Sequence, residues 1–376
     1  MPLQKKLNNP FLLTGFYDKK YFCNRNNEFN TLLDHFNNER NVVVYSWRRL
    51  GKTALIRYLF SELEKKGETV CIYADLFSAS DMADAIRLIA TAVYEKSGKT
   101  SSGISEALVR LMSQIGVELS FDPVSGTPRI GIGYRQGVIP EKSLNALGEF
   151  LSHFKKRVIL CLDEFQQITS FSDENAEAVF RTWMQNFPQI RFIFSGSHRT
   201  IMNAMFSEKK RPFYRSAQLL QLDPINSEEY SKFIQNHFSA NGKTITPSAI
   251  SAVYEWSRGQ TYSIQLVCNK LFGNYDQVDT VNLQSMFDEI IDQESPVFSS
   301  YTKLLTSTQW EVFKAIAKEE PLKGVTSKEF AGKYGLGAAS SISTALKKLL
   351  STELVIIENG NYYIHDVLLA RWLQRQ

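Results

Sequence analysis

The sequence predicts an α/β protein with a five-stranded parallel sheet, followed by an all-α module and a C-terminal winged helix-turn-helix. Five short apolar runs alternate with stretches of helical periodicity between residues 42 and 222, which is typical of β-α-β units. Residues 226–294 show helical patterns only, and three short helices and a hairpin follow. We therefore expect three domains, over residues 1–225, 226–294 and 304–376.

The composition is that of a water-soluble globular protein. Hydrophobic residues make up 43% and charged residues 22% of the 376 residues, and a chain of this length usually forms more than one core. The net charge of +4 is too small to argue for nucleic acid by itself. No apolar run approaches about 18 residues and no secretory pattern appears, so we expect no membrane segment and a cytoplasmic location.

The cysteines also indicate a reducing compartment. They are far apart and lack the spacing of a metal site, so we expect reduced thiols in the core. The four are Cys23, Cys71, Cys161 and Cys268.

The first predicted strand leads directly into a phosphate-binding loop. Residues 42–45, VVVY, are four consecutive apolar or aromatic residues, as expected for a strand covered on both faces. The next eight residues, SWRRLGKT at 46–53, fit the pattern G-x-x-x-x-G-K-[ST] at every fixed position but the first, where Ser46 replaces glycine. A helix over 53–66 follows and ends at Gly67.

This pattern suits the binding of a phosphate chain, because backbone N–H groups at a helix N-terminus point toward bound phosphates. Gly51 allows close approach of the backbone, Lys52 supplies a positive charge for the β- and γ-phosphates, and the Thr53 hydroxyl is a candidate Mg²⁺ ligand. The expected nucleotide-binding residues of the loop are Ser46, Arg48, Arg49, Leu50, Gly51, Lys52, Thr53 and Ala54. The alternative is a strand–loop–helix junction that fits the pattern by chance.

Two acids close the third core strand. The run RVILCL at 157–162 is followed by Asp163 and Glu164. The carboxyl end of a parallel strand faces the edge of the sheet where ligands bind. Asp163 can therefore hold Mg²⁺ through water, and Glu164 can orient or deprotonate the attacking water. The alternative is that both acids cap the helix that follows.

The fourth strand, RFIFSGS, ends in small polar residues. Ser195 and Ser197 can hydrogen-bond a γ-phosphate or the catalytic water, or can cap the helix over 199–206. We expect His198 to be a solvated histidine at the start of that helix. The basic segment that follows ends at Arg215, which is either an arginine finger for developing phosphate charge or a solvated side chain.

The remaining core elements are assigned from periodicity. A second strand is expected over 69–76 and a helix over 80–96. A small β-hairpin, about residues 115–136, is inserted before a helix over 141–154. A fifth strand over 217–222 completes the sheet.

The helical module after the last core strand occupies the usual place of a nucleotide lid. Its helices are expected over 227–238, 247–257, 262–271 and 283–293. The charge run and the proline at 292–296 mark a domain boundary.

The pattern from residue 304 onward is typical of a winged helix-turn-helix. Helices are expected over 309–318, from Ser327, and over 338–350, with a hairpin over 354–364 across an Asn-Gly turn. The third helix offers serine, threonine and two lysines but no arginine, and residues 297–376 hold ten Lys/Arg against seven Asp/Glu. A module that reads DNA usually shows a heavier basic footprint. Duplex DNA and a protein partner are both candidates.

These motifs, in this order, resemble those of the archaeal-type P-loop ATPases of the STAND branch, relatives of AAA+ proteins and of origin-recognition ATPases. The resemblance spans residues 15–372, with a Walker A motif at 48–53, a Walker B motif at 162–164 and a phosphate-sensing strand end at 195–197. It implies a five-stranded P-loop NTPase core of AAA+-like type, an all-α lid and binding of Mg·ATP.

The resemblance also implies roles outside the phosphate loop. Phe22, Arg25 and Glu28 match a motif that helps to shape the adenine pocket, although an ordinary amphipathic helix with a charged first turn is the alternative. Arg215 matches an arginine that precedes the last core strand, and Leu222-Asp223-Pro224 matches the segment that follows that strand.

Two positions depart from the family pattern. Ser46 replaces the first Walker A glycine, which still permits the loop but can tighten or shift the phosphate cradle. The lid motif Gly-x-Pro appears as Gly259-Gln260-Thr261, so that Thr261, or Tyr262 beside it, takes the place of the proline near adenine. Neither change removes a charged group, and we expect ATP or ADP and Mg²⁺ as ligands.

The expected function is slow, Mg-dependent hydrolysis of ATP to ADP and phosphate in a nucleotide-controlled conformational switch. Lys52, Glu164 and Arg215 are the expected catalytic residues, with Thr53 and Asp163 as metal ligands. Arg215 makes most sense in a homo-oligomer, where it would meet ATP on another subunit. The main alternative is a DNA-binding winged-helix regulator with a weak or vestigial nucleotide site. A kinase is disfavoured, because the paired acids favour water as the acceptor.

Overall fold

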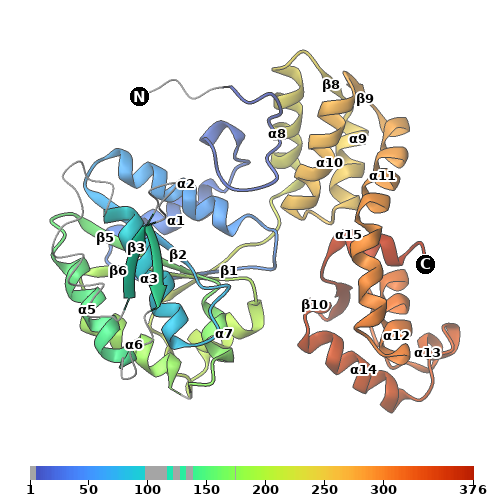
Figure 1. The fold of residues 1–376 in the computed structure, drawn as a ribbon. Coiled ribbons are helices and arrows are strands. Elements are labelled where there is room, and N and C mark those ends of the chain that lie inside the picture. Colours follow the sequence, from blue (N-terminus) through green and yellow to red (C-terminus); the bar gives the residue numbers. More distant parts are fainter. Residues whose placement is uncertain (1–5, 98–116, 122–127, 133–138, 174) are drawn as a thin grey trace. The chain divides into compact units, whose positions relative to one another are not determined.

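The computed structural model describes residues 6–97, 117–121, 128–132, 139–173 and 175–376. The chain forms two compact units (Figure 1). One unit is Gly15–Asp223, and the other joins the described residues up to Thr14 with Pro224–Gln376. Among the described residues, no helix has the length and apolar character needed to cross a membrane.

The Gly15–Asp223 unit is built on a five-stranded parallel sheet in the order β2-β5-β6-β1-β7, which confirms the expected core. The strands are β1 (Val42–Tyr45), β2 (Thr69–Asp75), β5 (Arg157–Asp163), β6 (Ile190–Gly196) and β7 (Gln218–Gln221). Every residue of β1 and of β6 is buried, as expected for central strands that are covered on both faces.

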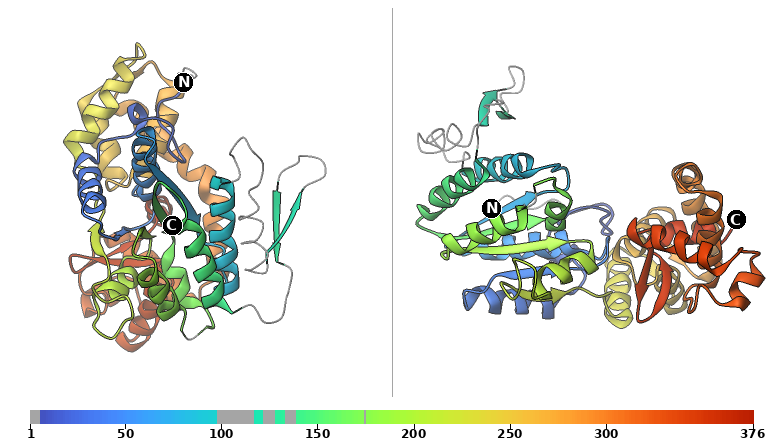
Figure 2. Two further views of the ribbon diagram at one scale, coloured as in Figure 1. Left: turned by 90° about the vertical axis from the view of Figure 1, so that its left-hand side faces the viewer. Right: turned by 90° about the horizontal axis from the view of Figure 1, so that it is seen from below.

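Helices cover both faces of this sheet (Figure 2). The helices are α1 (Asn26–Asn37) and α2 (Lys52–Lys65) on one face, and α3 (Met82–Ser97), α5 (Pro140–Ser152), α6 (Ala176–Asn186) and α7 (Arg199–Ser207) on the other. Side chains of β1 alternate between the two resulting clusters: Val42 and Val44 pack with α1 and α2, whereas Val43 and Tyr45 pack on the opposite face.

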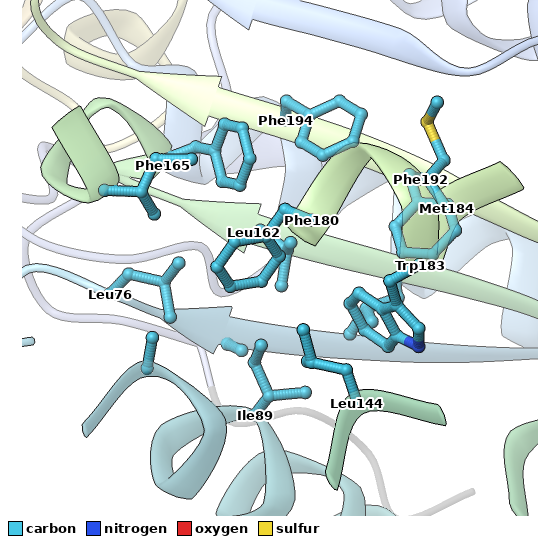
Figure 3. Close-up of a cluster of buried hydrophobic side chains, with 14 of the residues drawn as sticks. Leu76, Ile89, Leu144, Leu162, Phe165, Phe180, Trp183, Met184, Phe192 and Phe194 are labelled. Atoms are coloured by element: carbon cyan, nitrogen blue, oxygen red, sulfur yellow. The ribbon is translucent and has the colours of Figure 1, made fainter. Parts of the chain in front are cut away.

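The larger cluster is rich in aromatic side chains (Figure 3). The ring of Trp183 lies 5.3 Å from that of Phe192, and Phe192 stacks on Phe194 along β6. Phe165, which directly follows the two acids of β5, packs 4.6 Å from Phe194. The carboxyl ends of β5 and β6 are therefore held together by ring packing as well as by backbone hydrogen bonds.

A small hairpin is inserted between α3 and α5. β3 (Val117–Phe121) and β4 (Pro128–Ile132) pair antiparallel, with Val117 opposite Ile132. This pairing agrees with the hairpin expected about residues 115–136, whose turn lies outside the described residues.

The other unit begins with a helical module. Its elements are α8 (Ser227–Ser239), β8 (Thr244–Ile245), α9 (Pro247–Trp256), α10 (Thr261–Asn274), β9 (Gln277–Val278) and α11 (Thr280–Ser299). Helix α11 continues through Pro296, so no loop marks the boundary predicted at 292–296. Proline removes the hydrogen bond to the carbonyl of Asp292, but both residues are exposed and that carbonyl is open to water.

The start of the chain packs on this helical module. Phe11 is 1% exposed and its ring contacts those of Phe233, Phe238 and Phe272, at 5.6–6.2 Å between centroids. The Asn9 side chain donates to the Asn269 carbonyl, and the Asn269 side chain donates to the Phe11 carbonyl, each at 2.8 Å. This apolar anchor explains why the segment before Gly15 groups with the C-terminal unit. The sequence assigns this segment to the first predicted domain, residues 1–225.

The winged helix-turn-helix expected after residue 304 is present. It comprises α12 (Ser307–Glu319), α13 (Lys328–Lys333), α14 (Ala339–Ser351), β10 (Val355–Glu358), β11 (Asn361–Ile364) and α15 (Val367–Leu373). The Ser327 hydroxyl caps α13, as predicted. Asn359 and Gly360 both have positive φ, as a type I′ hairpin turn requires. Helix α15 was not predicted, because its seven residues are too few to show a helical pattern in the sequence.

The Phe11 anchor can be tested by truncation. We expect Phe11→Ala to lower the free energy of local unfolding of α8 and α10 by about 3–5 kcal/mol, because a buried ring is replaced by a cavity. Native-state hydrogen exchange of these two helices measures this change. Leu13→Ala, which removes a side chain that is 38% exposed, is the matched control and should stay within about 0.5 kcal/mol. Equal protection in the two variants would contradict the anchor.

Candidate functional site

The phosphate-binding loop joins β1 to α2 at the carboxyl edge of the sheet. Ser46, the residue after β1, donates its backbone N–H to the Gly196 carbonyl at 3.4 Å, which fixes the loop to β6. Arg49 and Gly51 have φ of 67° and 91°. Glycine adopts such a value without strain, and at Gly51 it allows the backbone to approach a ligand closely. Helix α2 then begins at Lys52, one residue before the predicted start at Thr53.

Ser46 has a defined role in this loop. The Lys52 ammonium donates to the Ser46 hydroxyl at 3.2 Å, and that hydroxyl donates to the Trp47 carbonyl at 2.8 Å. Lys52 is buried. The serine at the first Walker A position therefore gives a buried charge a hydrogen-bond acceptor, which glycine cannot supply.

Arg25 supports the loop from behind. Its guanidinium donates to the Leu50 carbonyl at 3.0 Å and pairs with Glu28 at 2.7 Å, and the residue is buried. The sequence associates Arg25 with an adenine pocket, whereas the structure places its charge on the backbone of the phosphate loop. A fixed Leu50 carbonyl fixes the adjoining peptide planes, and with them the direction of the N–H groups in the loop.

Asp163 lies opposite the start of α2. The Thr53 hydroxyl is 3.4 Å from Asp163 Oδ2, and the Tyr73 hydroxyl donates to the same oxygen. Burial, and then the Asp163 carboxylate, raise the pKa of Tyr73, so the phenol stays protonated. One hydroxyl and one carboxylate suit Mg²⁺, which usually takes few protein ligands and completes its shell with phosphate oxygens and water. Thr53 and Asp163 therefore fit the predicted metal site.

Glu164 lies between the ends of β5 and β6. Its Oε2 accepts hydrogen bonds from the Ser197 hydroxyl at 2.7 Å, the Ser197 N–H at 3.3 Å and Gln166 Nε2 at 2.5 Å. Its backbone is left-handed, with φ of 51°. Glu164 precedes a 3₁₀ helix, Phe165–Ser170, but its side chain makes no cap bond there. The alternative that this acid caps the next helix is therefore wrong.

The end of β6 presents two serines that differ in their surroundings. Ser197 is bonded to Glu164, whereas the fully buried Ser195 hydroxyl has no hydrogen-bond partner in the described part of the chain. Neither serine caps α7, because His198 does so by accepting the Ile201 N–H. Burial lowers the pKa of His198, against a backbone hydrogen bond that raises it, so this half-buried residue is a neutral cap at the helix start and is less solvated than the sequence predicts.

The other predicted residues make different contacts. Arg215 is exposed, and its guanidinium lies 5.2 Å from the ring of Tyr214. The ring of Phe22 packs 5.3 Å from that of Tyr58 on α2. Gly259 and Thr261 belong to the C-terminal unit, where Thr261 begins α10. Gly259 has φ of 68°, and a side chain there would approach Tyr254 and Pro224 within 3 Å, which explains the glycine.

Two residues of the site were not predicted from the sequence. Tyr73 contacts Asp163 across the β2–β5 pair, and Gln166 contacts Glu164. A tyrosine inside an apolar strand is ordinary, so Tyr73 gave no signal. Gln166 lies two residues after Glu164. This closeness in sequence could have predicted that Gln166 lies at the same edge of the sheet.

These features define a P-loop nucleotide-binding fold with a helical module and a winged helix. Two family descriptions match the chain: "ATPase domain predominantly from Archaea" over residues 22–267, and "Probable winged helix domain" over residues 296–375. The chain belongs to this family of ATPase domains. No curated protein sequence matches it.

Solved structures with the same fold cover nearly the whole chain. The Walker-type ATPase PABY2304 of Pyrococcus abyssi is 15% identical, with a TM-score of 0.68 over 97% of this chain and 99% of that one. Aeropyrum pernix ORC2, in ADPNP and ADP complexes, is 14% identical, with a TM-score of 0.63 over 97% and 95%. Aeropyrum pernix ORC1 in complex with DNA is 14% identical, with a TM-score of 0.54 over 98% and 96%. At these identities the likeness establishes the fold.

The contact between Arg25 and the loop gives a prediction. We expect Arg25→Ala to weaken ATP binding about 10- to 100-fold, because the loss of a charged hydrogen bond of about 1.5–3 kcal/mol frees the Leu50 carbonyl. Titration with a fluorescent ATP analogue measures this. Arg40→Ala is the control, since Arg40 is an exposed residue that pairs with Asp34 at the other end of α1. Similar affinities in both variants would show that Arg25 does not support the loop.

Proposed function

We propose that this protein binds Mg·ATP and hydrolyses it slowly, as a nucleotide-controlled conformational switch. One observation carries the proposal: the Thr53 hydroxyl of the phosphate loop lies 3.4 Å from Asp163, and Glu164 follows directly at the same edge of the sheet. A chance strand–loop–helix junction would not be accompanied by two acids at the end of β5, at the same edge of the sheet.

Each group has a distinct part in the proposed reaction. Lys52 would leave Ser46 to contact the β- and γ-phosphates, and the N–H groups of the loop would hold the phosphate oxygens. Thr53 and Asp163 would hold Mg²⁺, which would supply positive charge to the phosphates. Glu164 would orient the attacking water and accept its proton, and the unpartnered Ser195 hydroxyl is available to the γ-phosphate or to that water.

Glu164 starts from a position that does not favour fast turnover. Its carboxylate oxygen already accepts three hydrogen bonds, from Ser197 and Gln166. All three bonds end on Oε2, so they hold the carboxylate in one orientation, and it can meet the attacking water only through Oε1 unless it rotates. This restriction is consistent with a slow hydrolase, in which bound ATP persists long enough to select one conformation.

The C-terminal unit offers a route from nucleotide to winged helix. Arg258 immediately precedes the Gly259-Gln260-Thr261 turn. Its guanidinium pairs with Glu320 at 3.0 Å and donates to the Ile364 carbonyl at 2.6 Å. The Ile364 N–H donates to the same Glu320 oxygen at 2.9 Å. Arg258, next to the turn that the family resemblance associates with adenine, is thus bonded directly to the end of α12 and to the wing.

A second arginine joins the same parts. Arg371 of α15 donates through Nε and Nη2 to the Trp256 carbonyl, at 3.0 and 2.9 Å. The side chain of Glu320 is 3% exposed, and burial raises its pKa while Arg258 opposes that rise. Removing one partner of such a buried pair leaves an uncompensated charge. We therefore propose that a shift of the turn moves the winged helix with it.

The alternative function is a DNA-binding regulator with a weak nucleotide site. The exposed face of α14 carries Ser340, Ser341, Thr344, Lys347 and Lys348, and the similar Aeropyrum ORC1 was solved with DNA. The wing, however, ends in Glu358 and two asparagines around Gly360, which adds no positive charge. A duplex shift with steep salt dependence, without ATP binding, would favour this alternative.

The partners of the switch are also proposals. Arg215 is exposed, so it suits contact with ATP on a second copy of the chain. Light scattering with ATP, ADP or no nucleotide tests whether such a homo-oligomer forms. All four cysteines are buried, which supports the proposed cytoplasmic location.

The nucleotide site is tested by two substitutions. We expect Lys52→Ala to abolish Mg·ATP binding, because the charge for the β- and γ-phosphates is lost. We expect Glu164→Gln to keep ATP binding but to stop phosphate release, because the amide cannot accept the proton of water. Isothermal titration and a phosphate assay measure the two effects. Lys65→Ala, at the far end of α2, is the control, and unchanged ATP affinity in the Lys52 variant would refute the assignment.

The route to the winged helix is tested at Arg258. Hydrogen exchange of residues 307–373, compared between the ATP and ADP states, measures whether nucleotide affects this domain. We expect the wild type to show a difference and Arg258→Ala to lose it while still binding ATP. Lys270→Ala, which removes an exposed ion pair with Glu289 in the same module, should retain the difference. A full response in the Arg258 variant would exclude this route.

A further inference from the structure

Tyr73 connects the two residues proposed to hold Mg²⁺. It lies on β2, two residues before the strand ends, and its hydroxyl donates to Asp163 Oδ2 on the neighbouring strand. The Thr53 hydroxyl approaches the same oxygen, at 3.4 Å, and also interacts with the Tyr73 hydroxyl. Three oxygen atoms, from α2, β2 and β5, therefore meet at one point of the site.

We propose that Tyr73 is a positioning residue for the metal carboxylate. Its phenol would hold one oxygen of Asp163 in place, so that the carboxylate stays directed toward Thr53 when Mg²⁺ binds. The inference rests on the proposed function, because it concerns the Mg²⁺ site of the ATPase. Donors that hydrogen-bond a ligating carboxylate from outside the metal shell orient it, and their loss typically weakens metal affinity about 10- to 100-fold.

The ring of Tyr73 is itself held. The Arg57 guanidinium lies 3.8 Å from the ring centroid, close enough for a cation–π interaction. Arg57 is four residues after Thr53 on α2, and residues with this spacing share one face of a helix. One face of α2 thus carries Thr53, the proposed Mg²⁺ ligand, and Arg57, which holds the Tyr73 ring. The Tyr73 hydroxyl in turn holds the carboxylate of Asp163.

The backbone explains why this contact forms. Tyr73 pairs in register with Cys161, and Asp75 pairs with Asp163. Side chains two residues apart on a strand point to the same face, so Cys161 and Asp163 face α2 together, as Tyr73 does. A tyrosine has the length to reach from position 73 to the carboxylate one residue pair further along the strand, and a phenylalanine would fill the space without donating a hydrogen bond.

The inference differs from a simpler explanation, in which the Tyr73 hydroxyl occupies a coordination position of the metal. An occupant of that kind would compete with Mg²⁺, and its removal would strengthen metal binding. A positioning group supports Mg²⁺, and its removal weakens metal binding. The sign of the change distinguishes the two.

The test is Tyr73→Phe in the full chain, which keeps the ring against Arg57 and removes only the hydroxyl. ATP affinity is measured with a fluorescent analogue, first in EDTA and then across a Mg²⁺ titration, and Mn²⁺ binding to the ATP-bound protein is followed by electron paramagnetic resonance. We expect ATP affinity in EDTA to be unchanged and the Mg²⁺ and Mn²⁺ affinities of the ATP complex to fall about 10- to 100-fold.

Tyr94→Phe is the matched control, because Tyr94 is a buried tyrosine of α3 in the cluster on the opposite face of the sheet. It should leave all of these affinities unchanged. The unfolding midpoint of each variant without ligand checks that the fold is retained. Unchanged or tighter metal binding in folded Tyr73→Phe overturns the inference while the proposed function stands. Failure of the wild type to bind ATP overturns the proposed function, and this inference with it.

Discussion

The register between β5, β6 and β1 is the constraint on which the site depends. Leu162 lies opposite Phe194, and Val44 lies opposite Ser195. This pairing brings the phosphate loop, the two acids and the serine-containing end of β6 to one edge of the sheet. A slip of one residue in any of these pairs would turn every side chain of that strand to the opposite face. The aromatic packing around Phe194 makes such a slip costly, because it would expose large buried rings.

Neutral hydroxyl groups hold the charged side chains of the site in place. Lys52 donates to Ser46, and Glu164 accepts from Ser197. The carboxylate of Asp163 is held in the same way by two hydroxyls. Each of these charged side chains thereby has a neutral hydrogen-bond partner within the protein. The serine at the first Walker A position is thus part of the arrangement and not a defect of the motif.

The C-terminal unit is continuous from its first helix to its last. α11 crosses Pro296 without a break and carries Ser295, which accepts a hydrogen bond from the Trp372 indole at 3.0 Å. Arg258 and Arg371 add bonds between the helical module and the winged helix. A unit joined in this way has no loose linker at the predicted boundary. The proposed switch therefore requires movement of this unit as a whole, and not rotation of the winged helix alone.

The sequence by itself determined the five-stranded core, the phosphate loop, the paired acids and the winged helix, because each is recorded in local periodicity or in contiguous residues. Only the tertiary structure decided which side chains meet. Tyr73 and Asp163 are 90 residues apart, and Arg25 and Leu50 are 25 apart. Such outcomes depend on strand register and on the burial of distant side chains, which no local pattern contains.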